Sequence, residues 1–212
     1  MAYSGFSYRE PTDCRVSSLP ETAMILDFSH HMTRLCRDMA HRLDELSHID
    51  VPRIVVTASF NRKSSKDGVY ASVTPLRFRG GSRVGKLHGQ TMAMPLVCNA
   101  EGVEQLYILT FYLPRFLKTG FAEKLETVAH ELWHISPDFD GTLREFEGRC
   151  RIHGPTKEAF DAQSRKLARD YLGQHPPDEV TAFLRASWSE IRRNYRRLRV
   201  WQIPRPQMRR FA

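Results

Sequence analysis

The amino-acid sequence predicts a single domain of the α+β class, from its size and from the order of its hydrophobic patterns. The chain has 212 residues, 41% of them hydrophobic, which is enough to bury one sizeable core. A helical pattern comes first, short strand-like runs follow, and helical patterns return after residue 120. This segregation of strands and helices along the chain is typical of α+β domains.

The first helix is predicted over residues 21–47, where apolar residues recur at three- and four-residue steps. β-Branched and apolar runs then predict strands over 53–60, 69–78 and 105–113, the last of them stopped by Pro114. The apolar positions of the predicted helix are Ile25, Phe28, Met32, Leu35, Met39, Leu43 and Leu46.

Three further helices are predicted in the second half of the chain. Residues 121–135 carry one apolar face and end before Pro137, and residues 156–172 form a helix entered through Gly154 and Pro155. A last helix begins in the stretch PPDE at 176–179, with Asp178 as its N-cap. We therefore divide the chain into an N-terminal arm (1–20), a main domain (21–175) and a C-terminal helix with a basic tail (176–212).

The composition favours a soluble protein with reduced thiols. The opening residues contain no apolar segment of the length that export needs, and the longest apolar run, at 106–113, is too short to cross a bilayer. The four cysteines are scattered without a CxxC pair, which argues against both a zinc ribbon and a disulfide framework. We expect a cytoplasmic protein that does not bind membranes.

Positive charge is concentrated in two segments. The net charge is +8, and eight arginines with no acidic residue follow Glu190. The second segment, LRFRGGSRVGKLHG at 76–89, lies in a stretch without acidic residues between Asp67 and Glu101, and it is typical of a mobile basic loop.

The motif HELWH at 130–134 lies within the helix predicted over 121–135. Histidines four residues apart on a helix share one face, so His130 and His134 can reach a single metal ion. Glu131 is then placed beside the water that such a metal activates, where a general base is needed. The alternative is that both histidines are ordinary surface or core residues, because the motif is short.

A catalytic zinc site needs a third protein ligand, and three downstream residues are candidates. Asp140 has the spacing of the third ligand in metzincins, although Pro137 stands where that arrangement needs glycine. Glu158, on the following helix, would suit a gluzincin, and His153 precedes the start of that helix. Asp138 and Asp140 are also candidates to orient a ligand histidine, or they simply form an Asp-Gly turn.

The combination of HELWH with the downstream stretch HGPTKEAF resembles the SprT-like zinc metallopeptidases. The longer run from HELWH to RIHG is also similar to phage metallopeptidases, a related group. The resemblance covers residues 121–172 and implies Zn²⁺ as cofactor, with His130, His134 and His153 as ligands and Glu131 as catalytic base. It also implies a zincin-like fold of the minigluzincin or SprT-like kind, with an N-terminal helix, a small mainly antiparallel sheet, the HExxH helix and further helices after it.

If the resemblance holds, the chain hydrolyses peptide bonds in a protein or peptide substrate without a covalent intermediate. An edge strand before the active helix commonly binds substrate in such proteases, and 105–113 is the candidate. Its continuous apolar character fits a fully buried strand equally well.

The arginine-rich tail predicts a second partner, DNA or another polyanion, since aromatic residues alternate with its charges. A protease with this tail would act on nucleic-acid-associated proteins. The alternative function is a non-catalytic, metal-stabilised nucleic-acid-binding module. The residues expected to contact the polyanion are Arg192, Arg193, Arg196, Arg197 and Arg199.

Overall fold

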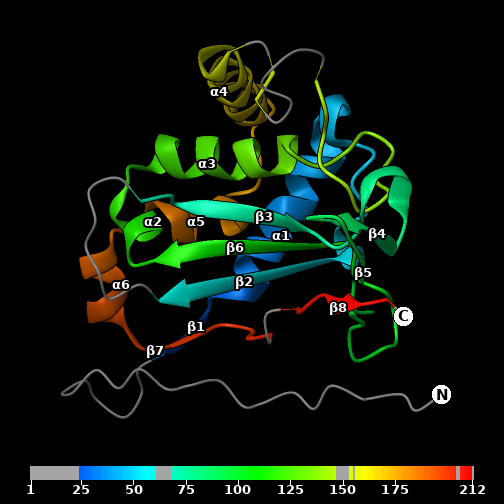
Figure 1. Cartoon of the computed structure of the whole chain (residues 1–212). Coiled ribbons are helices and arrows are strands. Elements are labelled where there is room, and N and C mark those ends of the chain that lie inside the picture. The colour runs from blue at the N-terminus through cyan, green and yellow to red at the C-terminus, as the bar shows by residue number, and fades with distance from the viewer. Residues whose placement is uncertain (1–23, 61–67, 147–152, 155, 204–205, 212) are drawn as a thin grey trace.

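The structure is a computed structural model that describes residues 24–60, 68–146, 153–154, 156–203 and 206–211 (Figure 1). It is an α+β fold, as the sequence predicted, and the expected arm over 1–20 lies outside the described residues. The helices and strands are β1 (Met24–Asp27), α1 (Phe28–Arg42), β2 (Ile54–Phe60), β3 (Ala71–Pro75), β4 (Val84–Leu87), β5 (Gln90–Ala93), β6 (Tyr107–Leu113), α2 (Arg115–Lys118), α3 (Phe121–Trp133), α4 (Lys157–Gly173), α5 (Asp178–Arg185), α6 (Trp188–Asn194), β7 (Tyr195–Arg199) and β8 (Arg209–Arg210).

Strand β6 is the centre of a three-stranded sheet in the order β2-β6-β3. It runs parallel to β2 and antiparallel to β3, so the sheet is mixed and not mainly antiparallel as expected. The segment between β2 and β6 returns the chain to the end of the sheet at which β2 begins, so the two strands run in the same direction. The central position buries most of β6 and leaves Thr110 and Tyr112 half-buried, so 105–113 is a largely buried strand and not an edge strand.

Helix α1 packs against the sheet and contributes a row of buried side chains, among them Phe28, Met32 and Leu35. It begins later than predicted, because Asp27 caps its first turn by accepting a hydrogen bond from the His30 N–H at 3.0 Å. The residues before Asp27 form β1 and pair in parallel with β7, which leaves Ile25 46% exposed and outside the core.

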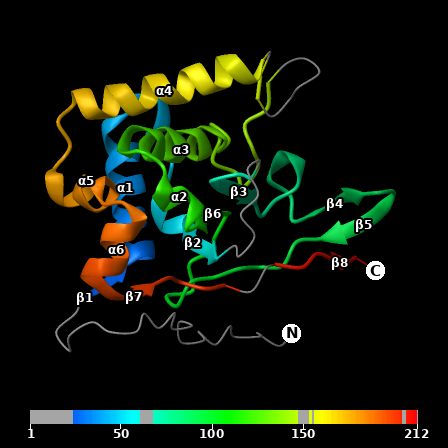
Figure 2. The ribbon, with the colours of Figure 1, turned by 90° about the vertical axis from the view of Figure 1, so that its left-hand side faces the viewer.

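Helix α3 lies beside the edge strand β3, and α4 packs across α3 (Figures 1 and 2). Helix α3 begins where predicted, and the Glu123 carboxylate accepts a hydrogen bond from the Gly120 N–H at 2.8 Å. Figure 2 shows that the helices α1, α5 and α6 cover one side of the sheet, while the β4–β5 hairpin projects from the other.

The predicted last helix is divided into α5 and α6. Pro177 occupies the N-cap position of α5, one residue before the predicted cap Asp178. The break follows α5, where the buried Lys124 ammonium group donates to the carbonyls of Leu184 and Ala186. Ser187 and Glu190 then form a capping box that begins α6, a signal already present in the sequence SWSE.

The basic segment 76–89, predicted as a loop, contains β4 and the turn of the β4–β5 hairpin. His88 and Gly89 both have positive φ, as the tightest hairpin turns require. Strands β4 and β5 pair on either side of this turn, and β8 from the C-terminal tail adds a third strand. Within the described part of the chain, no helix has the length and apolar character needed to cross a membrane.

Tyr107 on β6 anchors the segment that follows α3. Its hydroxyl donates to the Thr142 carbonyl at 2.8 Å and accepts from the Gly141 N–H at 3.0 Å. We expect Tyr107→Phe to lower the free energy of unfolding by about 2 kcal/mol, because both backbone groups lose a partner. Urea denaturation measures this. In the control, Tyr70→Phe at a tyrosine that is 44% exposed, the change stays within about 0.5 kcal/mol, and equal losses in the two variants would contradict the prediction.

Candidate metal centre

Helix α3 places His130 and His134 toward α4. Their apolar neighbours Val128 and Leu132 are fully buried, which fixes the rotation of the helix about its axis. Both imidazoles contact the Phe160 ring of α4, with centroid distances of 4.7 Å for His130 and 4.5 Å for His134. The two rings therefore lie between the helices, near one another.

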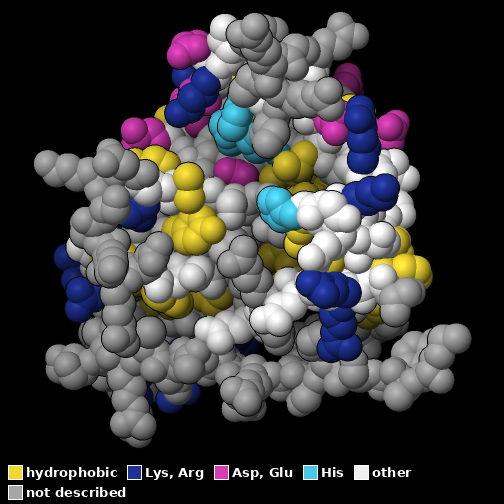
Figure 3. All heavy atoms as spheres, viewed as in Figure 1, with side chains coloured by type: hydrophobic (Ala, Val, Ile, Leu, Met, Phe, Trp, Pro, Cys, Tyr) yellow, Lys and Arg dark blue, Asp and Glu magenta, His cyan; other side chains and the backbone are white. Residues whose placement is uncertain are grey.

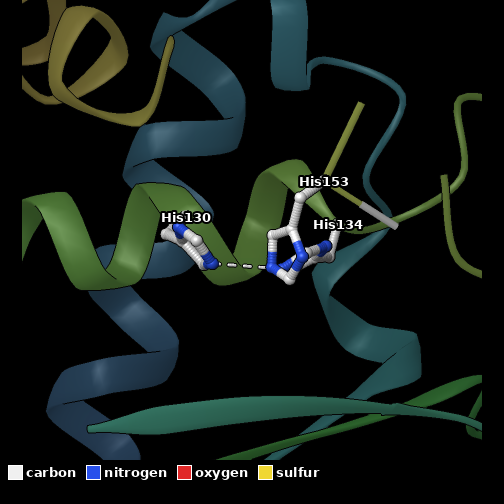
Figure 4. A group of neighbouring side chains, drawn as sticks. All are labelled: His130, His134 and His153. Carbon is white, nitrogen blue, oxygen red and sulfur yellow. Dashed lines mark hydrogen bonds between the residues drawn. The ribbon is translucent and has the colours of Figure 1, made fainter. Parts of the chain in front are cut away.

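His153 completes a cluster of three imidazoles (Figure 4). It lies in the segment before α4, where Gly154 turns the chain with a φ of 73°. One ring nitrogen of each of His130, His134 and His153 lies within 4.8 Å of the other two. This is close enough for the three histidines to bind one metal ion, although it does not identify the metal.

The nitrogen positions fit a small divalent ion. His130 Nε2 and His134 Nε2 are 3.1 Å apart. Two nitrogens bound tetrahedrally to zinc at 2.0–2.1 Å would be about 3.3 Å apart. Zinc commonly takes imidazole ligands of this kind, but other divalent transition metals do so as well.

Burial favours the neutral, metal-binding form of His130 and His134. Burial, together with the neighbouring His130, His153 and Arg144, lowers the pKa of His134 to about 3. Burial also lowers the pKa of His130, against the raising effect of Asp161. Because neutral imidazoles keep a free lone pair, metal binding at these two residues does not have to displace protons at neutral pH.

Asp161 on α4 is the carboxylate beside the cluster, a residue that the sequence reasoning missed. Its Oδ1 lies 3.4 Å from His130 Nδ1, and the Ser164 hydroxyl lies 3.5 Å from the same nitrogen. A carboxylate in this position orients a ligand histidine through its second N–H. The helical spacing of Phe160, Asp161 and Ser164 would have indicated it, since these residues share the face of α4 that meets α3.

The other candidates for the third ligand lie outside the cluster. Asp140 Oδ1 accepts hydrogen bonds from the backbone N–H and the hydroxyl of Thr142, at 3.0 and 2.6 Å, which closes a turn at Gly141. The Asp-Gly turn interpretation is therefore the one that the structure supports for Asp140. Glu158 is exposed on the first turn of α4. Throughout the described ranges, the three histidines are the only such group of potential ligands.

Glu131 follows His130 on α3 and is 7% exposed. Burial raises the pKa of its carboxyl group to about 7, against the lowering effect of a backbone hydrogen bond from Val73 on β3. A carboxyl group with a pKa near neutrality can both accept and return a proton. Glu131 therefore combines burial with a pKa near neutrality, and its role as a general base stays a prediction.

The fold and this site define an α+β protein with three histidines arranged to bind one metal ion. No protein-family model matches the chain, and neither a curated protein nor a solved structure matches it significantly. Function is therefore argued from the site itself.

The cluster predicts that wild-type protein binds one metal ion per chain. We expect His153→Ala to lose the metal and Asp140→Ala to retain it, because only His153 belongs to the cluster. Asp161→Asn should weaken metal affinity by about 10- to 100-fold, since an amide orients the His130 ring less well. Elemental analysis and metal titration of the folded variants measure these effects. Metal loss in Asp140→Ala with retention in His153→Ala would refute the assignment.

Glu131 should make the metal-free protein less stable as the pH rises. Its pKa is 4.5 in the unfolded chain and about 7 in the folded one, so the folded state holds the extra proton between these values. Between pH 4.5 and 8 we expect the unfolding free energy of wild type to fall by about 3 kcal/mol relative to Glu131→Gln. Urea denaturation with a chelator present tests this. The histidines titrate in both proteins, so their contributions cancel in the difference. Parallel pH profiles of the unfolding free energy in the two proteins would contradict the prediction.

Proposed function

We propose that the chain is a zinc-dependent metalloendopeptidase of the SprT-like kind, with a zincin-like fold. The observation that carries the proposal is a buried glutamate with a near-neutral pKa, located between two members of the three-histidine cluster on α3. A purely structural metal site has no need of an acid–base group in this position. The ligands are His130, His134 and His153, and Glu131 is the general base.

Zinc, when bound, supplies a Lewis acid that polarises the scissile carbonyl and acidifies water. The Glu131 carboxylate takes a proton from the attacking water and delivers it to the nitrogen of the leaving amine. Asp161 holds the His130 ring through Nδ1, which keeps Nε2 directed at the metal. Phe160 packs against all three imidazoles and limits the access of bulk water from the α4 side.

We propose β3, and not the predicted strand 105–113, as the strand that binds substrate. Both edges of β6 are already paired, with β2 and β3. The Tyr112 N–H donates to the Tyr70 carbonyl, so the alternation of an antiparallel pair directs the backbone groups of Ala71, Val73 and Pro75 away from β6. Val73 reaches Glu131 from this free edge. A peptide added to β3 would therefore pass beside the general base.

The substrates that we propose are proteins associated with nucleic acid, because the chain carries basic segments besides the site. The alternative, a non-catalytic module whose metal is structural, makes an opposite prediction for Glu131. In that module, replacing the glutamate would leave function unchanged.

Proteolysis by the zinc-loaded full chain tests the proposal. We expect cleavage of a fluorescently labelled, unfolded protein such as casein, with new N-termini identified by mass spectrometry. Glu131→Gln should keep its zinc and lose about 10²- to 10⁴-fold in rate, because the base is removed while the ligands remain.

Glu126→Gln is the matched control, since it removes the same charge from the same helix outside the histidine cluster. It should retain both zinc and activity. Activity in Glu131→Gln equal to that of wild type would refute the proposed role of Glu131. Zinc binding without cleavage of any unfolded protein would favour the non-catalytic module.

A further inference from the structure

The structure separates the arginine-rich tail into two parts that lie at different ends of the molecule (Figures 1 and 2). The first part forms α6 and β7, where β7 pairs with β1 and Arg199 lies 3.8 Å from the Asp27 carboxylate. The second part runs past β2, where the Thr57 hydroxyl bonds the Trp201 carbonyl, and ends as β8. The last two arginines therefore join the basic hairpin.

The basic residues around this hairpin differ in whether their charge is balanced. At its base, Arg77 pairs with Glu104, and Arg79 pairs with Glu145 at 3.1 Å. On the three-stranded sheet itself, four cations have no carboxylate partner in the described part of the chain. They are Arg83, Lys86, Arg209 and Arg210.

Two of these cations share one face of the sheet with an aromatic ring. Lys86 pairs with Thr91, and the Phe211 N–H donates to the Thr91 carbonyl at 3.0 Å. Arg209 pairs with Ala93 in the neighbouring row. Since alternate residues of a strand point to the same face, Lys86, Thr91, Ala93, Arg209 and Phe211 lie on one face.

This face, which we call the β4-β5-β8 face, is open to solvent. Lys86, Thr91 and Arg209 are exposed, and Phe211 is 57% exposed. On the opposite face, the Phe78 ring packs where Gly85 has no side chain, and Arg210 Nε donates to Gln90 Oε1 at 3.0 Å. On the side of the molecule shown in Figure 3, Lys and Arg side chains gather near the hairpin and the C-terminus.

We propose that the β4-β5-β8 face binds single-stranded nucleic acid, with Lys86 and Arg209 at the phosphates and Phe211 stacked on a base. Single-strand recognition combines two elements: cations that contact the phosphate backbone, and an aromatic ring that stacks on a base. An acidic protein or an anionic lipid surface would use the charges without needing the ring. This inference is independent of the proposed peptidase activity.

The salt dependence of binding gives the number of phosphate contacts. With a fluorescein-labelled single strand of about 16 nucleotides, we expect the full chain to bind with log K falling linearly with log[salt]. The two phosphate contacts of Lys86 and Arg209 would contribute about −1.4 to the slope, from about −0.7 per contact. Anisotropy titrations over a range of salt concentrations measure both the affinity and the slope.

Variants of the face separate charge from stacking. Lys86→Gln/Arg209→Gln should reduce the magnitude of the slope by about 1.4, since two phosphate contacts are lost. Phe211→Ala should weaken binding by about tenfold at every salt concentration and leave the slope unchanged. The matched comparison is Arg192→Gln/Arg193→Gln on α6, two residues that the sequence predicted as polyanion contacts. It removes the same charge at the other end of the molecule and, on this proposal, leaves the slope unchanged.

Three results would overturn the proposal. Equal loss of affinity in the α6 control would mean that net charge, and not this face, binds the strand. If Phe211→Ala binds the single strand as tightly as wild type does, and wild type binds duplex with equal affinity, then Phe211 does not stack on a base. Binding to vesicles that contain phosphatidylserine, without binding to the oligonucleotide, would make the face a membrane contact instead. Zinc content and peptide cleavage remain separate measurements, so failure here leaves the proposed peptidase untouched.

Discussion

The packing of α3 between β3 and α4 is the constraint on which the rest of the site depends. Leu125, Val128 and Leu132 are fully buried, so the helix cannot rotate without exposing them. This rotation presents His130 and His134 to Phe160 on α4, and Glu131 to Val73 on β3. One helix therefore directs two candidate metal ligands toward α4 and the proposed acid–base group toward β3.

The same burial sets the charge states that the proposed chemistry needs. It lowers the pKa of His134 to about 3 and raises that of Glu131 to about 7, because a buried site disfavours the charged form of either group. Neutral imidazoles can bind a metal, and a carboxyl group near neutrality can transfer protons. The helix packing thus determines both the position of the side chains and their protonation.

A second long-range arrangement concerns the C-terminal tail. The tail backbone runs from β7, past β2, to β8. Along this path it bonds to β1, to α1 and to β5, which are all distant from it in the sequence. The segment between β3 and the hairpin is bonded to the turn that follows α3, since the Arg77 N–H donates to the Gly141 carbonyl.

The sequence by itself determined the features that depend on local pattern. The helices α3 and α4, the strands β2 and β6, and the pair His130 and His134 all follow from spacing along one element or from a distinct motif. It could not choose between His153, Asp140 and Glu158, because the third ligand is fixed by how the segment before α4 returns to α3. Only the tertiary structure revealed that Asp161, and not Asp138 or Asp140, lies beside His130, and that β3 is the edge strand beside Glu131. It also showed that Arg209 joins Lys86 on one sheet. These relations arise from contacts between residues far apart in the chain, which local patterns do not encode.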